Sequence, residues 1–279
     1  MQVFETINAL QKELSQLNSK SIGLVPTMGA LHRGHLSLMN QSLEDNDITV
    51  VSVFVNPTQF NDKNDLEKYP RTLDKDTQLV NSLGVDYVFA PTVEEMYPEP
   101  DTRVFNYSPQ DEVMEGIYRP GHFNGMCQIV SKLFSIVQPT RAYFGEKDYQ
   151  QLVIVKRMVE DLKLDIEVVG CPIVREKDGL ALSSRNALLS KEERENALLI
   201  SKTLFESLKL AANYSLKETL SFVKNTIQQN DNLELQYFEI VDANTLLPLE
   251  EWEDSSSIIG CITVFCGAVR LIDNIKYKG

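Results

Sequence analysis

The sequence predicts an α/β protein whose N-terminal part is a doubly wound, Rossmann-like parallel sheet. Short apolar runs recur along the chain at intervals long enough to hold a helix between them. Several runs, such as residues 48–55, are rich in valine and typical of strands that helices cover on both faces. The pattern changes after residue 175. We therefore expect a Rossmann-like domain over residues 1–175 and a smaller α+β domain over residues 176–279.

The expected elements follow in chain order. Strands of the first domain are predicted at residues 22–25, 48–55, 87–90, 142–144 and 166–174. Helical spacing predicts helices over residues 1–20, from residue 36, and over 73–83, 127–137 and 152–162. In the second domain, Ser190–Glu193 and Ser215–Glu218 have the capping-box pattern that begins a helix. Residues 233–243 and 257–277 alternate or are β-branched, which predicts strands.

Composition limits the partners and the compartment. Forty acidic residues against 27 basic residues give a net charge of −13, which repels a nucleic-acid backbone, so no nucleic-acid partner is expected. We find no apolar run near the roughly 20 residues that span a bilayer, and no signal-peptide pattern. A soluble, cytoplasmic protein without membrane contact is therefore expected. The four cysteines lie in or beside apolar segments without a CxxC pair, which favours buried free thiols.

The segment 26–35 reads PTMGALHRGH and holds two of the three histidines of the chain. It lies between the first predicted strand and the helix predicted from residue 36, at the edge of the sheet where ligands bind in open parallel sheets. Gly29 and Gly34 allow a turn and a close backbone approach, and free N–H groups at a helix start favour phosphate. His32 and His35 can then donate hydrogen bonds to charge that develops at phosphorus.

Two other interpretations of this motif remain open at this point. A zinc site needs a third and usually a fourth ligand, while His122 is the only other histidine and the motif holds no acidic residue. A purely structural histidine pair is the second interpretation.

The motif resembles the HxGH signature of the nucleotidylyltransferase superfamily. This superfamily includes the class I aminoacyl-tRNA synthetases, and its histidines bind ATP.

Three further polar segments lie at strand ends or at the domain junction. Asn56-Pro-Thr-Gln59 ends the second strand, where side-chain amides can donate and accept hydrogen bonds. Residues 145–148, GEKD, follow the fourth strand and bring a lysine toward a phosphate. Residues 182–186, LSSRN, lie at the junction, a common place for a ligand cleft. Taken alone, each segment also has a simpler interpretation. The first fits a turn, the second a solvated charged cluster at a helix start, and the third a helix-capping loop.

Together the motifs resemble one family over nearly the whole chain. PTMGALHRGH, FVNPTQF, YPRT, GIYRPGHFNG, FGEKDYQQL, DGLALSSRN and YFEIVDANTL are similar to those of the pantothenate synthetase family, in its order and spacing. The resemblance implies a ligase of coenzyme A precursor biosynthesis with pantoate, β-alanine and Mg·ATP as substrates. Pantoate would attack the α-phosphate of ATP and release pyrophosphate. The amine of β-alanine would then attack the pantoyl adenylate and release AMP. A homodimer is also implied.

The same resemblance implies the site residues. The expected ATP contacts are Met28, Gly29, Ala30, Leu31, His32, Arg33, Gly34, His35, Gly145, Glu146, Lys147, Asp148, Val174, Leu182, Ser183, Ser184 and Arg185. The expected substrate-binding residues are Gln59, Gln151, Asn56, His122 and Tyr69. His35 would be the acid of the first step, while His32, Lys147 and Arg185 would stabilise phosphate charge. No metal-binding residue is expected. LSSRN replaces the lysine-rich KMSKS loop of the synthetases, which leaves Lys147 as the expected cation on the phosphates.

Two rival functions belong to other classes. A simple nucleotidylyltransferase shares HxGH and the α/β domain but ends with a stable nucleotide-linked product. A catalytically silent ATP sensor or scaffold binds ATP and releases no pyrophosphate. The second domain and the two glutamines favour the ligase over the first, and the histidines with the GEKD lysine argue against the second.

Overall fold

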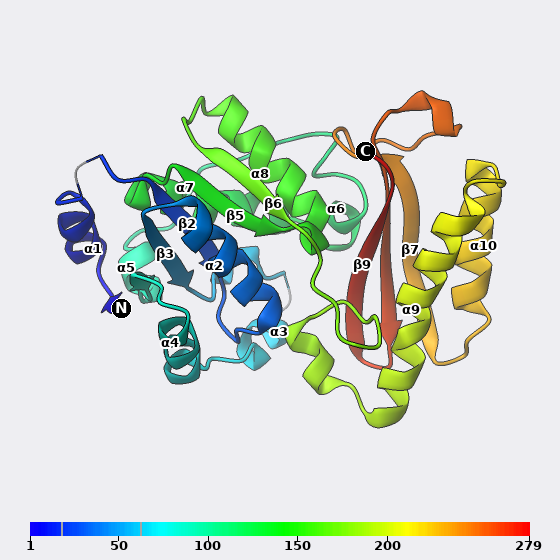
Figure 1. Cartoon of the computed structure of the whole chain (residues 1–279), viewed down its shortest axis with the longest axis horizontal. Helices are drawn as coiled ribbons and strands as arrows, with labels where there is room; N and C mark the ends of the chain where they lie inside the picture. The colour runs from blue at the N-terminus through cyan, green and yellow to red at the C-terminus, as the bar shows by residue number, and fades with distance from the viewer. Residues whose placement is uncertain (18, 62) are drawn as a thin grey trace.

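Two β-sheets organise the chain, one parallel and one antiparallel (Figure 1). The computed structural model describes residues 1–17, 19–61 and 63–279. The six-stranded sheet has the order β1-β4-β3-β2-β5-β6 with every pair parallel, and the three-stranded sheet has the order β7-β8-β9 with antiparallel pairs. The predicted fold class is confirmed.

The parallel sheet consists of β1 (Gln2–Phe4), β2 (Ile22–Thr27), β3 (Ile48–Val53), β4 (Tyr87–Phe89), β5 (Arg141–Gly145) and β6 (Glu167–Cys171). The helices around it are α1 (Ile7–Leu14), α2 (Arg33–Asp45), α3 (Lys63–Lys68), α4 (Leu73–Ser82), α5 (Val93–Met96), α6 (Glu115–Tyr118), α7 (His122–Val137) and α8 (Tyr149–Asp161). The second sheet consists of β7 (Leu233–Asp242), β8 (Ile258–Cys266) and β9 (Val269–Lys278), with helices α9 (Lys191–Leu210) and α10 (Leu216–Gln228). Short 3-10 turns are η1 (Pro57–Gln59), η2 (Glu146–Asp148), η3 (Ser184–Leu188) and η4 (Trp252–Asp254).

The strand order reverses at β2. The chain runs outward from β2 through β3 to β4, and later returns to the other side of β2 to form β5 and β6. The carboxyl ends of β2 and β5 are therefore neighbours, and the loops that leave them diverge. In open α/β sheets this is where a ligand crevice forms.

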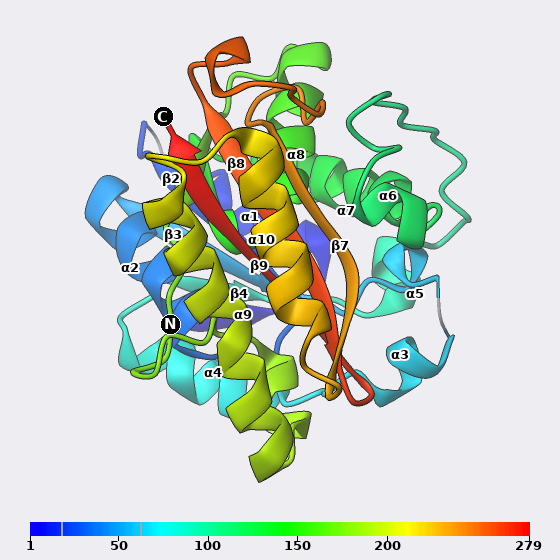
Figure 2. The same ribbon diagram turned by 90° about the vertical axis from the view of Figure 1, so that its right-hand side faces the viewer.

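Apolar side chains alternate between the two faces of the parallel sheet. Leu24 of β2 packs with α1, α7 and α8, whereas Val25 packs with α2 and α4. Figure 2 shows α9 and α10 covering the outer face of the second sheet, where Leu204 and Phe238 are fully buried. A smaller cluster that includes Val153 of α8 and Ile259 of β8 joins the two halves of the chain.

Several details differ from the sequence prediction. Residues 1–20 do not form one helix, because residues 2–4 form an exposed edge strand that pairs with β4, and α1 begins only at Ile7. An exposed edge strand of three residues has no apolar run to reveal it. The strands predicted over 257–277 form a hairpin of β8 and β9. All four cysteines, Cys127, Cys171, Cys261 and Cys266, are buried and free, as predicted. In the described part of the chain no helix is long and apolar enough to cross a membrane.

The different burial of two leucines on α9 predicts that their substitution by alanine changes the stability of the protein to different extents. Leu204 is fully buried against the second sheet, while Leu208, one turn later, is 37% exposed. We expect Leu204→Ala to lower the free energy of unfolding by about 2 to 5 kcal/mol, because it leaves a cavity. Leu208→Ala, the matched control, should cost less than about 1 kcal/mol. Urea unfolding of both variants measures the difference, and equal losses would contradict this packing.

Candidate active site

The two histidines of PTMGALHRGH form a reciprocal cap at the start of α2. His32 is the N-cap residue, and its Nδ1 accepts the N–H of Gly34 at 3.1 Å. The Nδ1 atom of His35 accepts the N–H of His32 at 3.2 Å. A neutral imidazole that accepts at Nδ1 carries its proton on Nε2. Each ring therefore has one free donor, and the ring centroids lie 4.1 Å apart.

Position 34, between the two histidines, is a glycine for a steric reason. A Cβ atom on Gly34 would lie 2.9 Å from Cε1 of His32, closer than side-chain carbons approach one another. Because His32 folds back over the first turn to cap it, only a residue without a side chain fits at this position. The HxGH spacing is thus the spacing that this cap requires.

Both histidines are neutral near pH 7. Burial, helped by the charge of Lys147, lowers the pKa of His32. Burial, with the neighbouring His32 and Lys147, lowers the pKa of His35 to about 3. The rings therefore face the cleft as neutral hydrogen-bond donors, with positive charge supplied by Lys147 beside them.

A cleft lies at the ends of β2 and β5, and the loop before α9 also lines it. Of the residues expected to bind ATP or substrate, it is lined by Met28, His32, Gly34, His35, Tyr69, Gly145, Lys147, Asp148, Gln151, Val174, Leu182, Ser183, Ser184 and Arg185. Segments more than 150 residues apart in sequence thus meet around one space. The expected ATP contacts that do not line it are Gly29, Ala30, Leu31, Arg33 and Glu146.

Asp76, which sequence reasoning missed, holds the loop before the histidines. Its carboxylate is 3% exposed and accepts the N–H groups of Ala30 at 3.0 Å and Leu31 at 2.8 Å. Gly29 (φ +81°) and Ala30 (φ +50°) both adopt the left-handed conformation, which turns these N–H groups toward the carboxylate. No local pattern announces this role, since Asp76 lies 46 residues from Ala30 and reads as a solvated helix residue.

Lys147 and Arg185 are the lysine and arginine among the residues that line the cleft. The side chain of Asn274 on β9 donates to the carbonyl oxygens of Glu146 at 2.8 Å and Lys147 at 3.0 Å, which fixes η2. An Arg185 Nη2 atom lies 3.3 Å from Asp65 on α3. Both ends of that ion pair are partly exposed, so the pair is weak and open to replacement by another anion.

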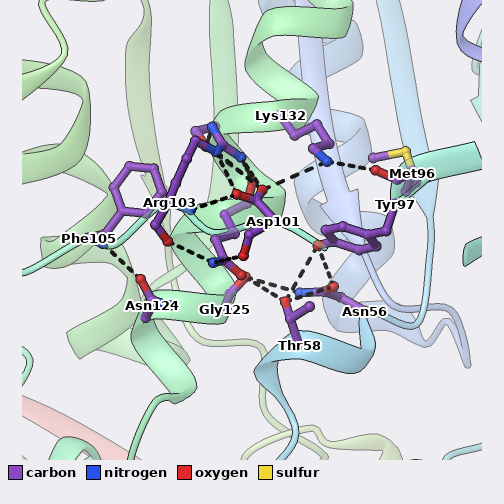
Figure 3. A network of polar contacts seen from close by, with 12 residues as sticks. Asn56, Thr58, Met96, Tyr97, Asp101, Arg103, Phe105, Asn124, Gly125 and Lys132 are labelled. Carbon is purple, nitrogen blue, oxygen red and sulfur yellow. Dashed lines mark hydrogen bonds and ion pairs between the residues drawn. The ribbon is translucent and has the colours of Figure 1, made fainter. Parts of the chain in front are cut away.

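Asn56, predicted to bind substrate, lies in a buried network of hydrogen bonds (Figure 3). Its Nδ2 donates to Gln59 Oε1 at 3.2 Å and to the Gly125 carbonyl at 3.1 Å. Its Oδ1 accepts from Tyr97 at 2.8 Å and from Thr58 at 3.2 Å. These bonds use every donor and acceptor of the amide, and Asn56 is 1% exposed. Asn56 therefore positions Gln59, and its contact with substrate stays a prediction.

Gln59 and His122 are held against each other beneath the cleft. Gln59 is buried and its Nε2 lies 3.1 Å from the sulfur of Met28, which lines the cleft. The Nδ1 of His122 lies 2.9 Å from the Gln59 carbonyl oxygen, so it is the protonated nitrogen of that ring. Burial lowers the pKa of His122 to about 4. His122 faces a second cavity beside the cleft.

A Rossmann-like sheet with two imidazole donors at a helix start, a lysine and an arginine around one cleft defines a nucleotide-binding α/β protein. The family model described as Pantoate-beta-alanine ligase matches residues 2–276. The chain belongs to the pantoate–β-alanine ligase family.

Relatives and solved structures agree with this family. The chain is 65% identical over 280 residues to the pantothenate synthetase of Bacteroides fragilis, with 100% of this chain and 99% of that protein covered. It is similar to the crystal structure of pantothenate synthetase from Thermus thermophilus, with a TM-score of 0.95, 44% identity and full coverage of both chains. It is also similar to the Francisella tularensis pantoate–β-alanine ligase, complexed with "Beta-gamma ATP" and β-alanine, with a TM-score of 0.82 and 36% identity over 99% of this chain and 98% of that one.

The burial of His35 predicts an unusual titration. Because the folded pKa of about 3 lies below the ordinary value of 6.5, the unfolded chain takes up the proton first. This group therefore removes stability as the pH falls from 6.5 toward 3. We expect the His35 ring signal in NMR spectra of the ligand-free protein to stay constant between about pH 8 and 5. A midpoint near 6.5 would contradict the neutral, buried ring.

Proposed function

We propose that this cleft activates the carboxylate of pantoate with ATP and passes the pantoyl group to β-alanine, which yields pantothenate for coenzyme A biosynthesis. The observation that carries the proposal is the convergence of two imidazole donors, Lys147 and Arg185 on one cleft at the switch point of the sheet. Such an array stabilises charge on a phosphate that is being displaced. Positioning and charge stabilisation supply the rate, so no protein nucleophile is needed.

ATP binds as its magnesium complex. The triphosphate lies at the N-terminus of α2, where the two histidines donate hydrogen bonds and the helix dipole favours negative charge. Arg185 exchanges Asp65 for a phosphate oxygen, and Ser183 and Ser184 lie beside it on the same wall. The phosphates of ATP would bring the magnesium ion, and Asp148, a half-exposed carboxylate that lines the cleft, would help to hold it. The ion would offset the negative charge of the phosphates.

In the first step a carboxylate oxygen of pantoate attacks the α-phosphorus. The new P–O bond forms as the bond to the β-phosphate breaks, and pyrophosphate leaves with the electron pair. His35 donates its Nε2 proton in a hydrogen bond to the reacting phosphate, and Lys147 balances the negative charge that develops there. His32 holds the neighbouring phosphate.

Pantoate is held through its hydroxyl groups. Gln151 lines the cleft, and Gln59 lies behind Met28 with its amide fixed by Asn56. Side-chain amides both donate and accept, as hydroxyl groups require. Tyr69, at the rim of the cleft, shields the adenylate from water.

In the second step the amine of β-alanine attacks the carbonyl carbon of the pantoyl adenylate. The C–N bond forms as the C–O bond to AMP breaks, and AMP leaves with the electron pair. The ammonium releases one proton before the attack and a second as the amide forms. Residues 176–279 close over ATP during this sequence, and the protein acts as a cytoplasmic homodimer.

A substitution of His35 tests the first step. We expect His35→Ala to lower pantoate-dependent ATP–pyrophosphate exchange, measured without β-alanine, by about 10²-fold. His35→Asn, which keeps an amide donor, should lose less. Far-UV circular dichroism of both variants checks that the fold is retained. Exchange by His35→Ala at the wild-type rate would remove His35 from the reaction, and no exchange by the wild type with pantoate would refute adenylation.

A further inference from the structure

We propose that Arg194, on α9, is a positioning residue for the loop that holds the phosphates of ATP, and that it acts through Glu176 and Asn186. The proposal rests on the proposed function, in which residues 182–185 contact the nucleotide. Arg194 itself lies outside the lining of the cleft. It therefore affects ATP binding by fixing the segment that lines the cleft.

A short hairpin leads into this loop. The N–H of Leu182 donates to the Val174 carbonyl at 3.0 Å, and both residues line the cleft. Between them the chain reverses at Gly179, which has a left-handed φ of +98° and donates its N–H to the Glu176 carbonyl at 2.9 Å. Because both ends of the hairpin line the cleft, a shift of the hairpin moves the wall of the cleft.

Arg194 binds this hairpin from α9. Its Nη1 donates to Glu176 Oε1 at 3.2 Å and its Nη2 donates to Glu176 Oε2 at 3.0 Å, the two-point geometry that a guanidinium forms with a carboxylate. Nη2 also donates to Asp178 at 2.6 Å. All three side chains are partly buried. The bidentate contact and the third charge distinguish this group from an isolated surface ion pair.

Asn186 connects the hairpin to the phosphate-binding loop. It is the last residue of LSSRN and lies in η3. Its Nδ2 donates to Glu176 Oε1 at 3.1 Å and to the Ala181 carbonyl at 3.0 Å. One oxygen of Glu176 thus accepts from Arg194 and Asn186 together, and the end of LSSRN is connected to α9.

The donor side of the Asn186 amide explains why an asparagine stands here. Its Oδ1 is buried and accepts no hydrogen bond from the residues that the structure describes. An unpaired buried acceptor is costly, so this amide contributes through the two bonds that its Nδ2 donates. An aspartate of the same shape could not donate them, and its charge would face the carboxylate of Glu176.

The position of Arg185 depends on the backbone of this loop. Its side chain pairs with Asp65, and that partly exposed pair is weak. Its backbone N–H donates to the Ser183 hydroxyl at 3.2 Å, and the N–H of Asn186 donates to the Ser183 carbonyl at 3.1 Å. These bonds keep the turn together, while Arg194 fixes the turn against α9. The guanidinium of Arg185 then meets the phosphates from a fixed base.

Binding of Mg·ATP, measured by isothermal titration calorimetry, tests the proposal without use of the reaction. We expect Arg194→Gln to raise the Kd for Mg·ATP by about 10-fold, because the loop loses its fixed geometry. Arg194→Lys keeps the charge but cannot bridge both oxygens of Glu176, so its Kd should lie between those of Arg194→Gln and the wild type. Lys191→Gln is the matched control, since it removes one positive charge from the exposed start of the same helix. Its Kd should equal that of the wild type.

A second arm joins the two ends of the network. If Arg194 and Asn186 act on the same loop, the double variant Asn186→Ala/Arg194→Gln should raise the Kd no more than the stronger single variant does. In pantoate-dependent ATP–pyrophosphate exchange, these variants should raise the KM for ATP and leave the KM for pantoate unchanged. A general loss of structure would change both, and thermal unfolding of each variant checks that the fold is retained.

Three results would overturn the proposal. These are a wild-type Kd for Mg·ATP in Arg194→Gln, a wild-type Kd in Arg194→Lys, which would leave charge alone as the cause, and additive losses in the double variant. A wild type that binds ATP but supports no exchange would refute the proposed reaction. A raised Kd in Arg194→Gln would still support the positioning role in that case.

Discussion

The parallel pairing of β2 with β5 is the constraint on which the site depends. Gly23 and Leu24 of β2 lie beside Arg141 and Ala142 of β5, although these strands are separated by more than 110 residues. This pairing brings the HxGH loop and the GEKD turn to one edge of the sheet. Because the chain leaves β2 and β5 in opposite directions, the edge is open there and a cleft can form.

Buried ion pairs connect the second sheet to this edge. Arg175, just beyond β6, binds Asp273 of β9 at 2.7 and 2.8 Å, and Asn274 next to it holds the backbone of η2. Glu115 of α6 is bound by Arg270 of β9. Burial alone would raise the pKa of Glu115, but the hydrogen bonds and charge of Arg270 lower it. Removing one partner of such a pair leaves the other as an unpaired buried charge. The lysine and the second cavity are therefore positioned by the same contacts that join the two sheets.

The sequence predicted the residues that line the cleft better than the residues that hold them in place. His32, His35, Lys147 and Arg185 carry local signals, namely a scarce residue type, a glycine and a place at the end of an apolar run. Their convergence on one cleft follows from strand order, which local patterns do not contain. The contacts of Asp76 with the loop before the histidines and of Asn56 with Gly125 were not predicted, since each joins residues more than 40 positions apart. The edge strand β1 was missed because a short exposed strand has no apolar pattern.

The account depends on one chemical event, the attack of the pantoate carboxylate on the α-phosphorus of ATP. Pantoate labelled with oxygen-18 in its carboxylate follows this event atom by atom through a complete turnover with β-alanine. Mass spectrometry of the products should find one labelled oxygen in the phosphate of AMP and none in pyrophosphate. Label in pyrophosphate, or AMP without label, would contradict adenylation as the step that the cleft performs.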